Sequence, residues 1–365
     1  MSGRPYFNHS IIELEVVAVE NWENASILKS ISHELIYRTT RKARSLQQQI
    51  QQRIETLAET RRGLCDIEQY EIVLPPQWFK GVHLDRALIQ VGSPYNDSCK
   101  RVMFHFPEGS NLILEAGIRI LSIANQLSAD GKEVIFTFDD TNVFNYLNRM
   151  EFFFRLDPRI VVLPYRPDYS PKGRAESLVE IGEIVPGKNL GSLPGELADT
   201  FCTLAKVKSS SALGVAAFTV FAEMIGNVQE HSETVLSGYA ALQVYRPRRH
   251  RSYIQVVVSD SGKGIVNTLR PEISRSYSEY EKLPDSEIIK KMFEMGLSRF
   301  GPAEGRGEGL KRSWRQAMKT DSRLVIRQGT CSVTLRHGRL VADSNVHNSL
   351  APIRGSHISL EFYLD

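Results

Sequence analysis

Three polar side chains recur at four-residue spacing within an otherwise apolar segment of the second half of the chain. They are Glu223, Asn227 and His231, in a stretch that begins near Ala212. Four residues make slightly more than one helical turn, so the three side chains share one face of a predicted helix. Such a polar stripe indicates either a surface that faces solvent or a face held toward a ligand.

A second candidate is a carboxylate at the end of a strand. The apolar run from Ile254 to Val258 predicts a strand, and Asp260-Ser261-Gly262-Lys263-Gly264 follows it. Asp260 could accept a hydrogen bond from an exocyclic amine, while the glycines would let a flat ring approach the backbone. The alternative is an ordinary Asp-Ser-Gly hairpin turn.

A third candidate is a run of alternating glycines, Gly305-Arg306-Gly307-Glu308-Gly309-Leu310. The run precedes a segment through Ala317 that has the pattern of a helix. Glycines at a helix N-terminus expose backbone amides that can hold a phosphate. Each of the three signals is weak alone, and their order along the chain is what gives them specificity.

In this order the three segments resemble the N, G1 and G2 boxes of the GHKL superfamily, which includes gyrase, Hsp90, the histidine kinases, MutL and the bacterial anti-sigma Ser kinases. A fourth element, Arg354-Gly355-Ser356-His357 before the apolar run 358–364, resembles the Gly-Thr box and closing strand of that superfamily. The resemblance covers residues 196–365. It implies a Bergerat-type α/β sandwich that binds ATP and Mg²⁺.

The resemblance also implies roles for individual residues. Asn227 would help to hold Mg²⁺ between the phosphates, and Glu223 would be the general base that orients and deprotonates water. Asp260 would bind the adenine amino group. The remaining expected contacts are Gly262 and Gly264 on the base, Gly305, Gly307, Gly309 and Leu310 around the triphosphate, Lys263, Arg299 or Arg306 as charge partners, Ser356 in the last box, and His231 as a phosphate-side or structural neighbour.

Two residues depart from the superfamily pattern. Glu308 stands where an apolar residue is usual, and a carboxylate there would repel phosphate unless it points away. Ser356 replaces the usual Thr and keeps the hydroxyl. The segment 266–304 between the second and third boxes would be a lid ordered by the nucleotide.

The first part of the chain begins with a helical pattern. Residues 26–62 contain no Pro or Gly, and apolar side chains recur every three to four residues at Ile36, Ala43, Leu46, Ile50, Ile54 and Leu57. This pattern predicts one long amphipathic helix that either pairs with a second copy of the chain or docks on its own chain. A short strand is expected at Glu71–Leu74.

Between residues 101 and 167 the hydrophobic period alternates. It predicts strands at 102–106, 134–138 and 160–163, separated by helical stretches at 112–127 and 143–153. About 55 residues of this segment resemble the STAS domains of anti-sigma regulators. No hydroxyl residue stands at Leu114-Glu115-Ala116-Gly117, where regulatory members of that family carry a phosphorylatable Ser, and Ser110 fits an ordinary loop or N-cap serine.

These segments predict an α/β protein in four parts. They are an N-terminal helical region (1–95), a STAS-like α/β domain (96–168), a linker rich in Pro, Gly and Ser (169–195), and the GHKL-type domain (196–365).

Composition excludes several classes of protein. The 365 residues carry a net charge of only +3, so the overall charge does not indicate a nucleic-acid partner, which would need a local patch. The longest apolar stretch, 213–225, falls short of the ~20 residues that span a bilayer. The first residues do not have the pattern of a signal peptide, and four scattered cysteines do not form a metal motif. We expect a cytoplasmic protein without a membrane anchor.

Three functions remain open at this point. The first is an ATP-dependent regulatory enzyme that hydrolyses ATP slowly or transfers phosphate to a partner protein. The second is a nucleotide-gated binding module without turnover. The third is a histidine autokinase, because Ser32-His33-Glu34-Leu35 resembles a phosphoacceptor box, although the usual Arg-Thr-Pro continuation is replaced by Ile36-Tyr37-Arg38. Clamp-type ATPases have less support.

Overall fold

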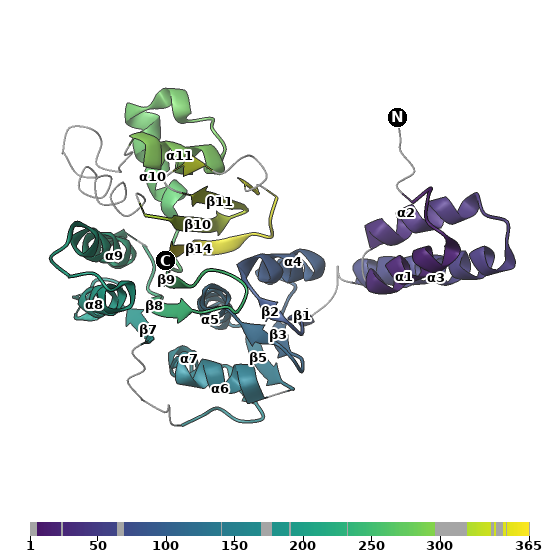
Figure 1. Cartoon of the computed structure of the whole chain (residues 1–365), viewed down its shortest axis with the longest axis horizontal. Coiled ribbons are helices and arrows are strands. Elements are labelled where there is room, and N and C mark those ends of the chain that lie inside the picture. Colours follow the sequence, from purple (N-terminus) through teal and green to yellow (C-terminus); the bar gives the residue numbers. More distant parts are fainter. Residues whose placement is uncertain are drawn as a thin grey trace. The chain divides into compact units, whose positions relative to one another are not determined.

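The computed structural model describes residues 6–22, 25–63, 69–139, 141–168, 177–189, 191–231, 233–295, 320–336, 339–340, 346–347 and 349–364. The chain forms two compact units, Met1–Glu68 and Gln69–Asp365 (Figure 1). The fold is mixed α/β, with one parallel and one antiparallel main sheet.

The first unit contains three helices, α1 (Ile11–Glu20), α2 (Ala25–Ile36) and α3 (Arg41–Gly63). A capping box begins α1: the Ser10 hydroxyl accepts from the backbone N–H of Glu13 at 3.3 Å, and the Glu13 carboxylate accepts from the backbone N–H of Ser10 at 2.6 Å. The three helices share a buried apolar core made of Leu14, Ala18, Leu28, Ile31, Leu35, Ala43, Leu46, Ile50 and Ile54.

The prediction of one continuous helix over residues 26–62 is wrong. The chain leaves the helical conformation after Ile36, and a new helix starts at Arg41. The Thr40 hydroxyl accepts from the backbone N–H of Ala43 at 3.2 Å, which caps the new helix. The apolar stripe therefore packs within its own chain, with α2 against α3.

The second unit starts with a four-stranded parallel sheet in the order β1-β3-β5-β6. Its strands are β1 (Gln69–Val73), β3 (Arg101–Phe106), β5 (Glu133–Phe138) and β6 (Val161–Leu163), and a two-stranded pair joins β2 (Trp78–Phe79) to β4 (Asn111–Leu112). Its helices are α4 (Gly81–Val91), α5 (Leu114–Ala129), α6 (Thr141–Arg149) and α7 (Phe152–Arg155). The alternating period is confirmed here, except that the last predicted helix is divided at Met150–Glu151.

An eight-stranded antiparallel sheet makes up the rest of the second unit, in the order β12-β11-β10-β14-β9-β8-β7, with β13 paired to β11. Its strands are β7 (Leu178–Ile184), β8 (Gly238–Tyr245), β9 (Tyr253–Ser259), β10 (Ser322–Gly329), β11 (Cys331–Arg336), β12 (Arg339–Leu340), β13 (Val346–His347) and β14 (Ile353–Tyr363). The helices of this part are α8 (Leu193–Ala205), α9 (Ala212–His231), α10 (Ile265–Ser276), the short 3₁₀ helix η1 (Ser278–Tyr280) and α11 (Asp285–Met295).

The two faces of the antiparallel sheet are both covered. Apolar side chains of α8, α9, α10 and α11 share one buried core with alternate residues of the strands. Helix α5 contacts β8, β9 and β14, and lies between the two sheets (Figure 1). Every residue of α5 except Ala129 is buried, as expected for a helix with a sheet on either side.

Three predicted domain boundaries need correction. β1 and α4 belong to the parallel sheet, so the first unit ends at Glu68 and not at residue 95. The predicted linker 169–195 contains β7, which pairs with β8. The predicted α/β and C-terminal domains form one compact unit, because α5 is buried between their sheets.

One described helix, α9, is long and apolar enough by length and composition to cross a membrane. Its apolar residues, including Ala217, Val220 and Phe221, lie in the core beside the antiparallel sheet. The structure therefore uses α9 as a core helix.

Candidate functional site

Helix α9 presents two of the predicted site residues on its exposed face. Glu223 and Asn227 are exposed, while Val220, Met224 and Val228 between them are buried against the sheet. The Ser211 hydroxyl accepts from the backbone N–H of Gly214 at 3.1 Å and begins the helix. The backbone of His231 ends α9, and its side chain lies outside the described residues.

Asp260 lies directly after β9 and is only 9% exposed. Its carboxylate accepts two backbone hydrogen bonds, from Gly262 at 2.7 Å and from Ser356 at 3.1 Å. Burial raises the pKa of this carboxyl to about 6, although the two hydrogen bonds act in the opposite direction. A buried carboxylate without a cationic partner in the described part of the chain is costly, which is typical of a group kept for a ligand.

Two glycines permit the close contacts around Asp260. Gly355 has φ +78°, and a Cβ there would lie 2.0 Å from the carbonyl oxygen of Asp260. Gly264 has φ +82° and turns the chain into α10. Because Gly264 has no side chain to cap that helix, the Ser356 hydroxyl accepts from the backbone N–H of Ile265 at 3.0 Å. A side chain at position 355 could not be accommodated.

The helix and the carboxylate loop approach each other through Gly238. A Cβ on Gly238 would lie 2.4 Å from Val228, the neighbour of Asn227, and 2.7 Å from the carbonyl oxygen of Ser259. Lys263, in the same loop as Asp260, forms an exposed ion pair at 2.6 Å with Glu233, just beyond α9. The structure thus brings together Asp260, Gly262, Gly264 and Ser356, with the C-terminal half of α9 beside them.

Several predicted site residues cannot be placed. Gly305, Arg306, Gly307, Gly309 and Leu310 lie outside the described residues, as do Arg299 and Glu308. His33 of the alternative phosphoacceptor box is exposed on α2, in the first unit.

Much of the expected lid belongs to the packed core. Residues 265–295 form α10, η1 and α11, and Val266, Ile273 and Ile289 are buried in the core of the antiparallel sheet. The prediction that the whole segment 266–304 depends on a nucleotide for its order is therefore wrong for residues 266–295.

Sequence reasoning missed a set of contacts that tie the candidate loops to α5. Gln126 of α5 donates to the Ser261 hydroxyl at 3.0 Å and accepts from the Tyr95 hydroxyl. Asp130, at the end of α5, forms an ion pair at 2.8 Å with Arg354, whose guanidinium lies 4.7 Å from the centroid of the Tyr95 ring. Both loops beside Asp260 are therefore attached to one end of α5.

A second chain of hydrogen bonds runs from α5 to the last box. Ser122 contacts the Ser259 hydroxyl at 2.7 Å, Ser259 contacts His357 Nδ1 at 2.6 Å, and His357 Nε2 lies 3.1 Å from the carbonyl oxygen of Arg354. Burial, with Arg119 and Arg327 nearby, lowers the pKa of His357 well below its usual range. A neutral imidazole that donates from Nε2 and accepts at Nδ1 satisfies every contact in this chain.

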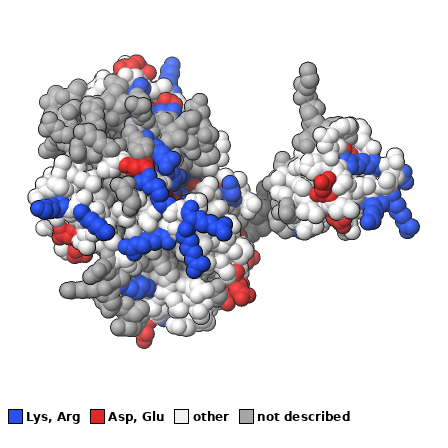
Figure 2. Space-filling model, viewed as in Figure 1, with Lys and Arg blue, Asp and Glu red and all other residues white. Residues whose placement is uncertain are grey.

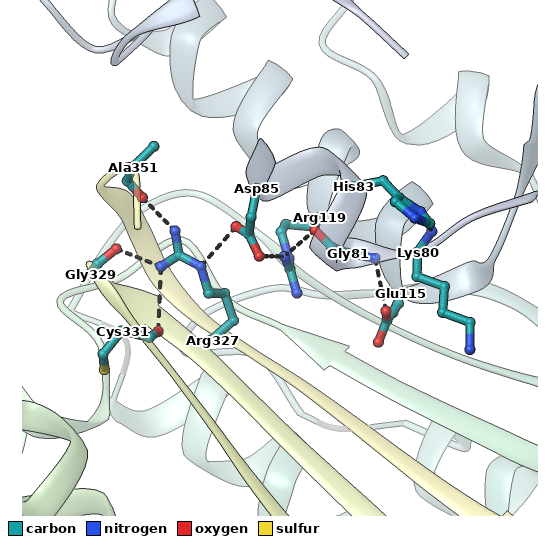
Figure 3. A network of polar contacts seen from close by, with 10 residues as sticks. All are labelled: Lys80, Gly81, His83, Asp85, Glu115, Arg119, Arg327, Gly329, Cys331 and Ala351. Carbon is teal, nitrogen blue, oxygen red and sulfur yellow. Dashed lines mark hydrogen bonds and ion pairs between the residues drawn. The ribbon is translucent and has the colours of Figure 1, made fainter. Parts of the chain in front are cut away.

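Two buried arginines share one carboxylate farther along the same interface (Figure 3). Asp85 of α4 contacts Arg327 of β10 at 2.9 Å and Arg119 of α5 at 3.1 Å. Arg327 is fully buried and also donates to three backbone carbonyls, those of Gly329, Cys331 and Ala351. Glu115 accepts from the backbone N–H of Gly81 at 2.8 Å in the same cluster.

No single short motif announced these interface residues. Tyr95, Gln126, Asp130 and Asp85 are isolated polar residues in the sequence, and their partners lie far away along the chain. The only usable signal was the polar content of the central part of α5, which reads Ser-Ile-Ala-Asn-Gln and is buried throughout.

Comparison with known proteins adds no assignment: no protein-family model, curated protein or solved structure matches this chain.

Proposed function

We propose that residues 196–365 form a GHKL-type domain of the Bergerat fold that binds Mg-ATP. In this proposal the chain is a cytoplasmic regulatory enzyme that hydrolyses ATP slowly or transfers its phosphate to a partner protein. The observation that carries the proposal is the buried Asp260 carboxylate, held by Gly262 and Ser356 between two glycines of positive φ, Gly264 and Gly355.

The hydrogen bonds of Asp260 fit adenine better than guanine. Each carboxylate oxygen accepts one backbone N–H in the described structure and keeps further acceptor capacity. The amino group of adenine can donate to that capacity. Guanine presents a carbonyl oxygen at the same ring position, which a carboxylate repels. Selectivity for ATP over GTP is therefore the first expected property.

Glu223 and Asn227 suit the phosphate side of the proposed site. Both are exposed on one face of α9, whose C-terminal half lies next to the Asp260 loop through Val228 and Gly238. Asn227 would hold Mg²⁺ through its amide oxygen, and Glu223 would orient a water molecule and take its proton. When bound with the phosphates, Mg²⁺ would neutralise the charge that develops on them.

Nucleotide binding to the full chain tests the first half of the proposal. Calorimetric titration with ATP and GTP in the presence of Mg²⁺ should show binding of ATP only. Asp260→Asn should weaken ATP binding about 10- to 150-fold, the equivalent of a hydrogen bond to a charged group worth about 1.5–3 kcal/mol. Asp199→Asn, at an exposed position of α8, is the matched control and should bind ATP normally. Equal binding of GTP and ATP by the wild type would reject the proposal.

Turnover is tested separately with Glu223→Gln. This substitution should leave ATP binding intact and reduce phosphate release or protein phosphorylation by a factor on the order of 100 to 10,000, as for loss of a general base. Release of free phosphate distinguishes hydrolysis from transfer to protein. Absence of both with the wild-type chain and Mg-ATP would exclude the enzyme.

A second candidate function is nucleotide-gated binding without turnover. It is favoured by the contacts of Gln126 and Asp130 with the loops that flank Asp260, because nucleotide binding there would bear directly on α5. The parallel β3-α5-β5 unit also supports the STAS-like interpretation of residues 96–168 and a signalling role. Partner binding that requires ATP but survives Glu223→Gln would support gating over catalysis.

A further inference from the structure

The loop between β8 and β9 carries a dense group of basic side chains. Residues 246–251 read Arg-Pro-Arg-Arg-His-Arg, and all four arginines and His250 are exposed. The loop contains no apolar side chain except that of Pro247, so it forms a cationic protrusion in a chain whose net charge is only +3.

Neighbouring strand ends extend this basic surface. Arg251 and Arg336 lie 5.6 Å and 5.5 Å from the centroid of the Tyr363 ring. Arg323 is opposite Arg336 in the β10-β11 ladder, and Tyr363 is opposite Tyr253 in the β14-β9 ladder. We call this surface the basic edge and define it by Arg246, Arg248, Arg249, Arg251, Arg323 and Arg336.

Figure 2 shows Lys and Arg side chains gathered across the middle of the larger unit, over the region of the β8, β9 and β14 strand ends. The nearby carboxylates are already engaged: Asp321 pairs with Arg251, and Glu361 pairs with Arg323 at 3.1 Å. Among the described residues, Arg246, Arg248 and Arg249 make no ion pair. Their three charges are available to an external anion.

We propose that the basic edge binds the phosphate backbone of a nucleic acid without regard to base sequence. All six side chains are arginines, whose planar guanidinium groups match phosphate oxygens with two parallel hydrogen bonds. Nucleic-acid interfaces are polar and strongly positive, whereas the centre of a protein interface is depleted of charge and enriched in aromatic side chains. The loop provides only the first kind of surface, and it lacks the apolar side chains that insert into a membrane.

The basic edge and the proposed nucleotide site lie at opposite ends of the same strands. Tyr253 begins β9 at the basic edge, and Ser259 ends β9 beside Asp260. Seven residues of strand span roughly 20 Å, so the loop can be changed without touching the Asp260 site. The inference goes beyond the proposed ATP function and does not depend on it.

The test is fluorescence anisotropy of labelled 30-nucleotide single-stranded DNA, single-stranded RNA and 30-base-pair duplex DNA, titrated with the full chain at several salt concentrations. The wild type is expected to bind with an affinity that falls steeply as salt rises. The double variant Arg248→Gln/Arg249→Gln should bind at least about tenfold more weakly in low salt, and its slope of log K against log salt should decrease by about 1.4–1.8, or two phosphate contacts.

The matched control is Lys206→Gln/Lys208→Gln, which removes the same charge from exposed positions of the α8–α9 loop. It should bind nucleic acid like the wild type, and both variants should keep the wild-type melting temperature. An equal loss in both variants would show a net-charge effect and overturn the proposal. Full competition by polyglutamate at an equal concentration of negative charge would also overturn it, in favour of an acidic protein partner, and so would absence of binding to all three probes in low salt.

Discussion

The antiparallel sheet has two faces of opposite character. Toward α8 and α9 it presents apolar side chains such as Leu242, Val256 and Leu360, all fully buried. Toward α5 and α4 it presents polar side chains that include Tyr239, Gln255, Ser259, His357, Ser359 and Arg327. The first face is held by non-directional burial, and the second by hydrogen bonds whose geometry is specific.

This difference suggests separate roles for the two interfaces. An apolar face stabilises the unit and tolerates substitutions that conserve volume. A buried polar face contributes little net stability, but it fixes positions and is costly to leave half satisfied. Here the fixed positions belong to the loops around Asp260, since Gln126 and Asp130 reach Ser261 and Arg354. We infer that the polar face orients the candidate site.

The largest effect is expected from breaking the buried charge cluster of the polar face. Asp85→Ala would leave Arg119 and Arg327 buried without a carboxylate, and breaking a buried pair in this way costs about 3–5 kcal/mol. Urea denaturation monitored by circular dichroism measures the loss. The control is Glu133→Ala, which removes the exposed ion pair with Arg101 and should cost about 0–1 kcal/mol. A loss of the same size in both variants would mean that the Asp85 cluster is hydrated in solution.

The apolar face should respond in stability but not in binding. Leu242→Ala would open a cavity beneath α8 and α9 and cost about 2–5 kcal/mol in the free energy of unfolding. The folded fraction should bind ATP as the wild type does, because Leu242 points away from the contacts of α5 with the candidate loops. Calorimetric titration well below the melting temperature tests this, and a large change in affinity would erase the distinction between the faces.

The two faces also differ in how well the sequence predicts them. The apolar strand 254–258 and the buried side of α9 could be recognised from hydrophobic period alone, and so could Asp260 at the strand end. Asp85 and Arg327 could not, because they are 242 residues apart and each resembles an exposed surface charge in its own segment. Polar partners are chosen by tertiary geometry, which leaves no local period.

The same reasoning explains the other misses. Thr40 capped a new helix inside a segment without Pro or Gly, because a single hydroxyl can satisfy the first N–H groups of the next helix. The basic loop 246–251 was visible in the sequence but was hidden by a near-neutral total charge. Burial of α5 between two sheets merged two expected domains into one compact unit.

The polar face should also make stability depend on pH. Because the folded-state pKa of His357 lies well below its usual 6.5, the unfolded chain takes up a proton that the folded chain resists as pH falls. This contribution is fully present above pH 6.5, and one such histidine accounts for a loss of up to about 1.4 kcal/mol between pH 7.5 and pH 5.5.

Asp260 acts in the opposite direction, so a difference between variants is needed. Its pKa is raised to about 6, and the folded state therefore gains relative stability as pH falls through 6. Urea denaturation of the wild type and His357→Gln at both pH values isolates the histidine, because Asp260 is common to both proteins. Equal pH dependence in the two proteins would contradict a neutral, buried His357.

The smallest expected effect is the most direct test of the orienting role. Gln126→Leu removes the hydrogen bonds from α5 to Ser261 and Tyr95 while keeping a side chain of similar size. Freed from α5, the Asp260–Ser261 loop should bind ATP about 3- to 10-fold more weakly, which corresponds to roughly 1 kcal/mol. The control Tyr146→Phe deletes a bond to Gln243 elsewhere on the polar face, so its ATP affinity should not change. If both variants bind ATP as the wild type does, the polar face holds the two sheets together without positioning the candidate site.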